Sequence, residues 1–243
     1  MEVIYNSHEN GIGSGIESTQ SPGTDEIILS VRDVVKSYKV GDGGTLTVLD
    51  HVNLELPKGK LIMFMGRSGS GKTTLMNLLS TLDDVTSGDI GFNGNWYSSM
   101  SVEEKERLRR NKIGFVFQTV ALIPVMTAYE NIDFGLRTAG VKNKDERSKR
   151  INEVLDLVGL TDRAKHFPAE LSGGERQRIA ICRAMAHRPE LFFADEPTGA
   201  LDTASGIYIA ELFRKLTRVE GFTVIMTTHD TRLSELADVL IKL

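Results

Sequence analysis

The sequence predicts an α/β fold with a largely parallel sheet, and three observations support this prediction. Short apolar runs of strand length alternate with amphipathic stretches of helix length. One such run, residues 61–65, leads into a glycine-rich loop and then into a helical pattern, an order typical of α/β folds. The chain has 243 residues, of which 40% are hydrophobic and 26% are charged, so it can bury a substantial core. No internal repeat divides it, and we expect one domain with subdomains.

The first part of the chain contains four predicted strands. Residues 27–35 and 46–56 are alternating, β-branched runs separated by a glycine-rich turn, which favours two antiparallel strands. Residues 61–65 are continuously apolar, as expected for a strand that is buried on both faces. Residues 87–92 precede an Asn-Gly pair, which indicates a short strand followed by a turn.

The second part of the chain continues the alternation of strands and helices, which is why a parallel sheet is expected. Within its helical stretch, residues 144–158 carry apolar side chains on one face. The predicted elements are a strand at 113–117, a mainly helical insert from about 126 to 187, strands at 191–194 and 222–226 with an amphipathic helix at about 203–219 between them, and a last strand at 239–243.

Composition excludes several classes of protein. The formal net charge of −4 gives no general attraction to nucleic acid, which is therefore not an expected partner. No apolar run approaches the roughly 20 residues of a membrane-spanning helix, so we expect any membrane contact to be peripheral. The single Cys182 lies in an apolar helical run and is interpreted as a small buried side chain. Residues 1–25 are rich in Gly, Ser, Asn and Thr, which predicts a disordered tail rather than a secretory signal.

The glycine-rich loop has the spacing of a phosphate-binding loop. Glycines allow successive backbone N–H groups to approach a phosphate, and the start of a helix behind them favours an anion. Lys72 can bridge the β- and γ-phosphates, and the Thr73 hydroxyl can bind Mg²⁺. The alternative is a glycine-rich turn before a helix. The predicted phosphate-binding residues are Gly66, Arg67, Ser68, Gly69, Ser70, Gly71, Lys72, Thr73 and Thr74.

Two carboxylates follow the apolar strand at 191–194. Asp195 and Glu196 lie where a parallel sheet ends at its carboxyl edge, which is where ligands of open α/β sheets bind. A carboxylate at the position of Asp195 can hold Mg²⁺ through water. The pair resembles a Walker B motif followed by a catalytic glutamate, which implies that Glu196 polarises an attacking water molecule. The alternative is a polar strand end that Pro197 prevents from continuing.

The segment 171–175, Leu-Ser-Gly-Gly-Glu, begins a predicted helix. Ser172 and Glu175 have the spacing of a capping box, so helix capping alone is one interpretation. Capping does not need Gly173 and Gly174, however, and a helix start with two glycines is an open anion site. We therefore expect Ser172, Gly173 and Gly174 to bind phosphate.

In identity, order and spacing, these motifs from about residue 27 to 243 resemble one nucleotide-binding domain of an ABC transporter. The resemblance implies an α/β fold of the P-loop NTPase type, an ABC cassette with a mixed core sheet, an antiparallel β subdomain and an α-helical subdomain. Here the domain would cover residues 26–243 and its helical subdomain roughly 98–178. ATP and Mg²⁺ are the implied substrate and cofactor. A second copy is implied too, because in this family the Ser and Gly of the 171–175 motif bind the γ-phosphate held by the opposite subunit.

The resemblance also gives roles to residues that are unremarkable alone. Gln118 resembles the glutamine that contacts Mg²⁺ and the nucleophilic water and couples to the membrane subunit. Asp202 resembles the aspartate of the D-loop, and His229 resembles the switch histidine at the γ-phosphate. Tyr38, expected in a short loop after the first strand, resembles the aromatic residue that stacks on adenine. Taken singly, such side chains are more often ordinary surface or core residues.

Within the family, segments 168–202 and 115–118 look like the group that powers macrolide export, lipoprotein release and antimicrobial-peptide resistance. The expected function is ATP hydrolysis at the cytoplasmic face of the plasma membrane, coupled to export or mechanotransmission by a separate transmembrane permease subunit. A cell-division ATPase or an importer ATPase is the alternative within the family. A soluble DNA-repair or translation protein would need a long coiled-coil insertion or two cassettes, and a small-molecule kinase leaves 171–175 unexplained.

Overall fold

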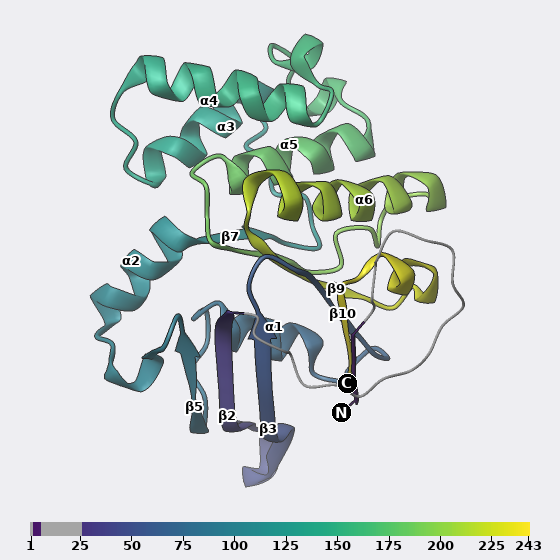
Figure 1. The fold of residues 1–243 in the computed structure, drawn as a ribbon. Helices are drawn as coiled ribbons and strands as arrows, with labels where there is room; N and C mark the ends of the chain where they lie inside the picture. Colours follow the sequence, from purple (N-terminus) through teal and green to yellow (C-terminus); the bar gives the residue numbers. More distant parts are fainter. Residues whose placement is uncertain (1, 6–25) are drawn as a thin grey trace.

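The computed structural model describes residues 2–5 and 26–243, and this part of the chain contains a six-stranded and a four-stranded sheet (Figure 1). In the larger sheet the strand order is β1-β10-β4-β9-β8-β7. Its five strands from β10 to β7 are parallel, as predicted, and β1 adds to the edge in the antiparallel sense. The strands are β1 (Glu2–Tyr5), β4 (Leu61–Met65), β7 (Ile113–Val116), β8 (Leu191–Ala194), β9 (Thr223–Thr228) and β10 (Val239–Lys242).

The smaller sheet is antiparallel and has the order β3-β2-β5-β6. The predicted pairing of the first two strands is confirmed, but β2 continues to Lys39. Tyr38 therefore lies within a strand, where it pairs with Leu46, and the expectation that it lies in a loop is wrong. The strands are β2 (Ile27–Lys39), β3 (Thr45–Pro57), β5 (Ser87–Phe92) and β6 (Asn95–Trp96).

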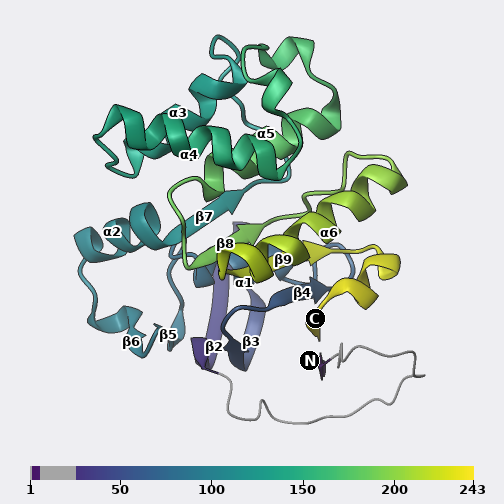
Figure 2. The same ribbon diagram turned by 45° about the horizontal axis from the view of Figure 1, so that its top comes forward.

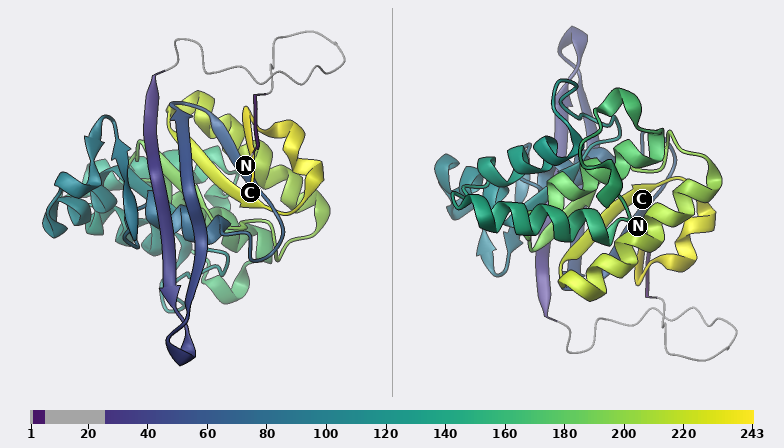
Figure 3. Two further views of the ribbon diagram at one scale, coloured as in Figure 1. Left: turned by 90° about the horizontal axis from the view of Figure 1, so that it is seen from below. Right: turned by 90° about the horizontal axis from the view of Figure 1, so that it is seen from above.

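Helices cover both faces of the six-stranded sheet. α1 contacts β3 and β9 and so lies between the two sheets, whereas α3, α4 and α5 form a layer on the other face (Figure 1). α6 packs on β9 on that same face (Figure 2). Figure 3 shows β2 and β3 on one side of the molecule, in the view from below, and the helical layer on the other, in the view from above. The helices are α1 (Lys72–Leu79), α2 (Val102–Lys112), α3 (Ala128–Thr138), α4 (Lys144–Leu157), α5 (Gly173–Met185) and α6 (Thr203–Glu220).

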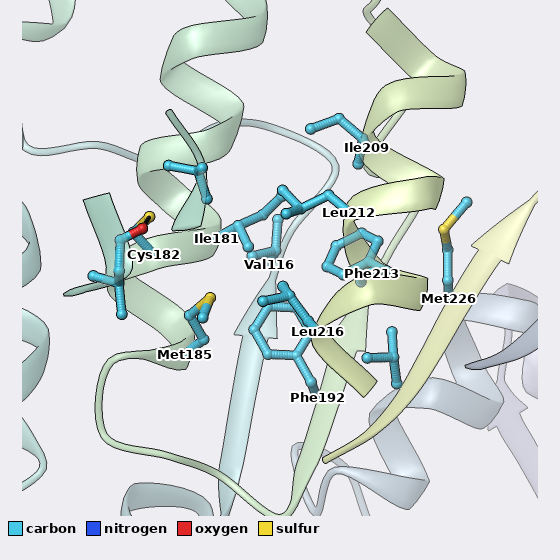
Figure 4. Packing of buried hydrophobic residues seen from close by; sticks show 14 of the residues in the cluster. Val116, Ile181, Cys182, Met185, Phe192, Ile209, Leu212, Phe213, Leu216 and Met226 are labelled. Carbon is cyan, nitrogen blue, oxygen red and sulfur yellow. Dashed lines mark hydrogen bonds between the residues drawn. The ribbon is translucent and has the colours of Figure 1, made fainter. Parts of the chain in front are cut away.

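Side-chain alternation along β4 explains why its sequence is apolar throughout. Leu61 and Met63 enter a hydrophobic cluster formed with α3 to α6, part of which is drawn in Figure 4. Ile62 and Phe64 point the other way, into a cluster formed with α1 and the antiparallel sheet. Both faces of the strand are thus buried, as predicted. Cys182 is buried in the first cluster, in agreement with its interpretation as a small core residue.

The two ends of the described chain meet at one sheet edge. β1 pairs with β10, and Glu2 forms an ion pair with Lys242 at 3.0 Å. The prediction of a disordered tail over residues 1–25 did not include this strand, whose apolar Val3 and Ile4 pack on the core clusters. Residue 1 and residues 6–25 lie outside the described residues. The proposed helical subdomain at roughly 98–178 stays a prediction.

Candidate active site

The glycine loop joins β4 to α1 at the carboxyl edge of the six-stranded sheet. Gly71 immediately precedes the helix with φ 93° and ψ 5°, a left-handed conformation that glycine adopts without steric cost. The Lys72 ammonium group donates hydrogen bonds to the carbonyl groups of Gly66 and Arg67, both at 2.9 Å. The loop therefore folds around the ammonium group at the start of a helix.

This loop has the chemistry of an anion site. Lys72 is 5% exposed, and its two hydrogen bonds go to carbonyl groups rather than to a carboxylate. The Ser70 hydroxyl is also buried, and no hydrogen-bond partner for it occurs in the described part of the chain. A buried cation and an unpaired hydroxyl beside a helix N-terminus fit a bound phosphate, because a phosphate supplies both negative charge and acceptor oxygens.

Asp195 follows β8 and reaches back to the first turn of α1. Its carboxylate accepts hydrogen bonds from the Thr73 hydroxyl at 3.1 and 3.2 Å and from the Thr227 hydroxyl at 2.7 Å. A hydroxyl and a carboxylate are hard oxygen donors of the kind that Mg²⁺ prefers, and magnesium in nucleotide sites takes further oxygens from the phosphates. No cluster of three or more His, Cys, Asp or Glu side chains suited to a metal occurs among residues 2–5 and 26–243. Thr73 and Asp195 thus fit Mg²⁺ as part of a nucleotide complex.

Side chains that follow two other strands, β7 and β9, lie beside the Glu196 carboxylate. The Gln118 side-chain amide, just after β7, donates to one carboxylate oxygen of Glu196 at 3.1 Å. The other oxygen lies 3.7 Å from Nδ1 of His229, which follows β9. Because the strands are parallel, their carboxyl ends meet at one edge, and residues far apart in sequence converge there. A carboxylate placed between an amide and an imidazole can accept a proton from water.

The 171–175 motif lies at the start of α5, in the helical layer on the face of the sheet opposite α1. Ser172 and Glu175 form the predicted capping box, with hydrogen bonds of 3.2 and 2.8 Å. Arg163 donates to the Glu175 carboxylate at 2.9 Å. This bond, together with the hydrogen bonds from Ser172, lowers the pKa of Glu175 to about 2. The motif is therefore a firmly capped helix start.

Among residues 2–5 and 26–243, no contact requires glycine at the two central positions of that motif. A Cβ added to Gly173 would meet Leu201 at 3.8 Å, and one added to Gly174 would meet Ser205 at 3.8 Å. Both are ordinary contact distances, and neither glycine has a left-handed backbone. Neither backbone conformation nor packing in the described structure therefore explains these glycines. Glycine is expected at such a position where another molecule approaches the backbone closely.

Comparison with known proteins identifies the family. The family model for ABC transporters matches residues 49–199 of the chain. The chain belongs to the ABC transporter family. The predicted fold class and family are therefore confirmed.

Relatives of this ABC protein include both short and long chains. The lipoprotein-releasing system ATP-binding protein LolD of Bacteroides thetaiotaomicron is 40% identical, over 87% of this chain and 94% of that protein. The macrolide export ATP-binding/permease protein MacB of Vibrio parahaemolyticus is 39% identical, over 90% of this chain but 33% of that protein. A solved structure of the cassette MJ0796 of Methanocaldococcus jannaschii, dimeric and bound to ADP and Pi, is 38% identical with a TM-score of 0.80, over 89% of this chain and 94% of that chain.

Two other predicted residues of the ABC cassette have clear intrachain contacts. Asp202 caps α6, where it accepts from the Ser205 N–H at 3.0 Å and the Ser205 hydroxyl at 2.7 Å, and the backbone bond lowers its pKa. The Tyr38 hydroxyl donates to Asp83 at 2.9 Å, and the Lys36 ammonium lies 4.9 Å from the ring centre. Tyr38 is 38% exposed, so its ring remains accessible for stacking, and its proposed adenine contact stays a prediction.

The sequence alone did not single out Thr227. This buried residue of β9 donates to Asp195 and accepts a hydrogen bond from the Glu196 N–H, also at 2.7 Å. The available signal was a hydroxyl near the end of an apolar strand. Threonine is β-branched and common in strands, however, so the sequence pattern gave no reason to separate it from its neighbours.

Proposed function

We propose that the chain is the ATP-hydrolysing subunit of an ABC transporter, which pairs with a second copy around two molecules of Mg-ATP. The observation that carries this proposal is the arrangement of Glu196 between Gln118 and His229, beside the Asp195–Thr73 pair. Three strand ends and the phosphate loop bring these groups together. Such a set matches what phosphoryl transfer to water requires: phosphate binding, charge neutralisation and a group that orients water.

In this proposal each residue of the site has a separate task. The glycine loop and Lys72 bind the β- and γ-phosphates, and the Lys72 charge stabilises the negative charge of the transferring phosphoryl group. Glu196 accepts a hydrogen bond from the attacking water, and Gln118 and His229 hold the Glu196 carboxylate in place. Mg²⁺, when bound through Thr73 and Asp195, neutralises phosphate charge. Water attacks the γ-phosphorus, and ADP and inorganic phosphate leave.

A second copy completes each site in this proposal. The capped start of α5 lies in the helical layer, where Ser172 is exposed and Gly173 and Gly174 are half-buried. Lys72, at the start of α1, lies on the opposite side of the sheet. No contact with the described residues requires glycine at positions 173 and 174, and a close approach to a nucleotide on another subunit supplies a reason for it. The MJ0796 cassette, which is dimeric and bound to ADP and Pi, supports this arrangement by analogy.

A membrane subunit is the proposed partner in transport. No helix of the described residues is long and apolar enough to cross a bilayer. LolD is named for lipoprotein release and MacB for macrolide export, so we propose export or mechanotransmission at the cytoplasmic face of the plasma membrane. The docking place that we propose for this subunit is a cavity of about 530 Å³ between α2, β7, α3 and α5. Phe115 and Phe134 line this cavity, and its β7 wall leads to Gln118.

The test is the substitution Glu196→Gln in the full chain. The amide keeps the shape of the side chain but cannot accept a proton, so we expect hydrolysis to fall by about 10²- to 10⁴-fold. ATP binding persists, and a dimer accumulates on size-exclusion chromatography with ATP. Glu211→Gln is the control, since Glu211 is exposed on α6 and has no ion pair in the described structure. Undiminished steady-state hydrolysis by Glu196→Gln contradicts the proposed function.

A further inference from the structure

We propose that Thr227 is a positioning residue for hydrolysis, because one hydroxyl group fixes both Asp195 and the main chain of Glu196. The inference rests on the function proposed above for these two carboxylates. Thr227 itself touches neither nucleotide nor water in this proposal, and it acts through the two residues that it holds.

The hydrogen bonds of Thr227 are short and fully enclosed. Its hydroxyl donates to Asp195 Oδ1 at 2.7 Å and accepts from the Glu196 N–H at 2.7 Å. The residue is 0% exposed, so no solvent competes for either bond. A hydroxyl has one proton to give, and that proton goes to Asp195, which leaves a lone pair for the Glu196 N–H. The single group thus connects the proposed metal-binding carboxylate with the backbone of the proposed base.

Strand register explains why Thr227 reaches these groups. In the parallel pair β8–β9, Ala194 lies opposite Met226, so the next residues, Asp195 and Thr227, continue as neighbours. Side chains alternate along a strand, so Thr227 shares its face with Ile225, which belongs to the cluster that contains α1. The hydroxyl therefore points to the side of the sheet where Thr73 also reaches Asp195.

The backbone of Glu196 needs this support. Glu196 has φ 41°, a left-handed conformation that is unfavourable for a residue with a Cβ and persists only where its surroundings enforce it. Its N–H is bonded to the Thr227 side chain. Removal of the hydroxyl leaves this N–H without that acceptor and frees the backbone to relax. A small rotation there moves the Glu196 carboxylate away from Gln118 and His229.

The same strand contains a matched threonine with an ordinary structural role. Thr223, at the other end of β9, is also 0% exposed, and its hydroxyl accepts from the Gly59 N–H at 2.9 Å. It has the same residue type, burial, strand and kind of backbone bond as Thr227. It lies at the amino end of the strand, away from Asp195 and Glu196. Thr223→Val therefore measures the cost of losing a buried hydroxyl from β9 without disturbing the site.

The experiment compares steady-state ATP hydrolysis by the full-length wild type, Thr227→Val, Thr227→Ser and Thr223→Val. Valine keeps the shape of threonine and removes the hydroxyl, so we expect kcat of Thr227→Val to fall by about tenfold or more, because misplacement of a reacting group by about 1 Å has large effects. KM for ATP changes by less than about threefold, since the phosphate loop is intact. Thr227→Ser restores most of kcat, and Thr223→Val keeps the wild-type kcat. Thermal unfolding of each variant confirms that it is folded.

Two results overturn the inference. One is a Thr227→Val variant that is folded and has the same kcat as Thr223→Val. The other is a folded Thr227→Ser variant whose kcat falls by about tenfold or more, and this result decides the question even where valine prevents folding. Failure of the proposed function is distinguishable, because it appears as undiminished hydrolysis in Glu196→Gln or as no hydrolysis by the wild type.

Discussion

The two glycine-containing motifs, the phosphate loop at 66–73 and the helix start at 171–175, use glycine for different reasons. In the phosphate loop, Gly71 has a left-handed backbone, and a Cβ there would approach Leu49 Cδ2 to 2.9 Å. In the 171–175 motif, neither Gly173 nor Gly174 has a left-handed backbone, and a Cβ at either position would lie at an ordinary contact distance of 3.8 Å. The first loop is therefore determined by its own chain. In the second motif, no contact with the described residues requires the two glycines, which is why the active site is proposed to form between two copies.

Among substitutions in these two motifs, Gly71→Ala is expected to have the largest effect. Alanine in a left-handed conformation costs about 1–2 kcal/mol, and the new methyl group also meets Leu49. We expect a lower free energy of unfolding in urea together with at least about 100-fold weaker ATP binding by calorimetry, because the loop changes shape.

Gly140→Ala separates strain from function in that experiment. Gly140 has φ 89°, and a Cβ there would have no atom within 4 Å. The variant should lose similar stability through its backbone and keep wild-type ATP affinity. Equal ATP affinity in Gly71→Ala and the wild type would show that the loop does not bind the phosphates.

Gly174→Ala is expected to have an intermediate effect that appears only in the dimer. Alanine suits a helix better than glycine, so the monomer should be as stable as the wild type or more stable by up to about 1 kcal/mol. Overpacking a close contact costs about 1–3 kcal/mol, so ATP-dependent dimerisation and hydrolysis should fall by about 5- to 150-fold. Thermal unfolding, sedimentation and an ATPase assay measure these quantities. A variant with normal hydrolysis would indicate that the two glycines face no second copy.

The smallest expected effect concerns the capping carboxylate of the same motif. Arg163 and the hydrogen bonds from Ser172 lower the pKa of Glu175 from 4.5 to about 2 in the folded chain. A lowered folded pKa means that the charged form stabilises the fold above about pH 4.5, and that this contribution disappears as the pH falls toward 2. Glu175→Gln should therefore be less stable by about 0.5–1 kcal/mol at pH 7.

This difference between Glu175→Gln and the wild type should shrink in urea unfolding curves recorded from pH 5 to pH 3. Glu211→Gln serves as the control for loss of an exposed carboxylate and should have the stability of the wild type at pH 7. A stability difference that is independent of pH would mean that the Glu175 charge does not support the helix start.

Much of the fold followed from the sequence because it depends on local patterns. The continuous apolar run of β4 and the alternation in β2 and β3 predicted strands that the structure contains, and the 144–158 pattern predicted α4. The pattern analysis gave less where local signals are weak, and it did not single out α2 as an element. α2 has no buried residue, so it lacks the apolar face by which a helix is recognised, and the range of β2 was underestimated by four residues at Lys39.

The candidate site was predictable in part. Motif spacing identified Lys72, Asp195 and Glu196, and the structure brings Gln118 and His229 to Glu196 as side-chain neighbours. Thr227 was missed, because its importance comes from strand register and not from its identity. Tyr38 was expected in a loop, whereas its backbone pairing with Leu46 places it in the antiparallel sheet.

The sequence by itself indicated the family through the resemblance of its motifs, and the fold class through apolar periodicity. It also supplied the residue types of the proposed nucleotide site, because motif spacing is a property of short segments. Only the tertiary structure decided which side chains meet. Parallel pairing of β7, β8 and β9 brings Gln118, Glu196 and His229 to one sheet edge, and the same pairing places Thr227 beside Asp195. α1 and α5 lie on opposite faces of that sheet. The glycines at the start of α5, which the sequence predicts to bind phosphate, are therefore on the other side of the sheet from the phosphate loop at the start of α1. These relations join residues distant in the chain, and packing and register alone fix them.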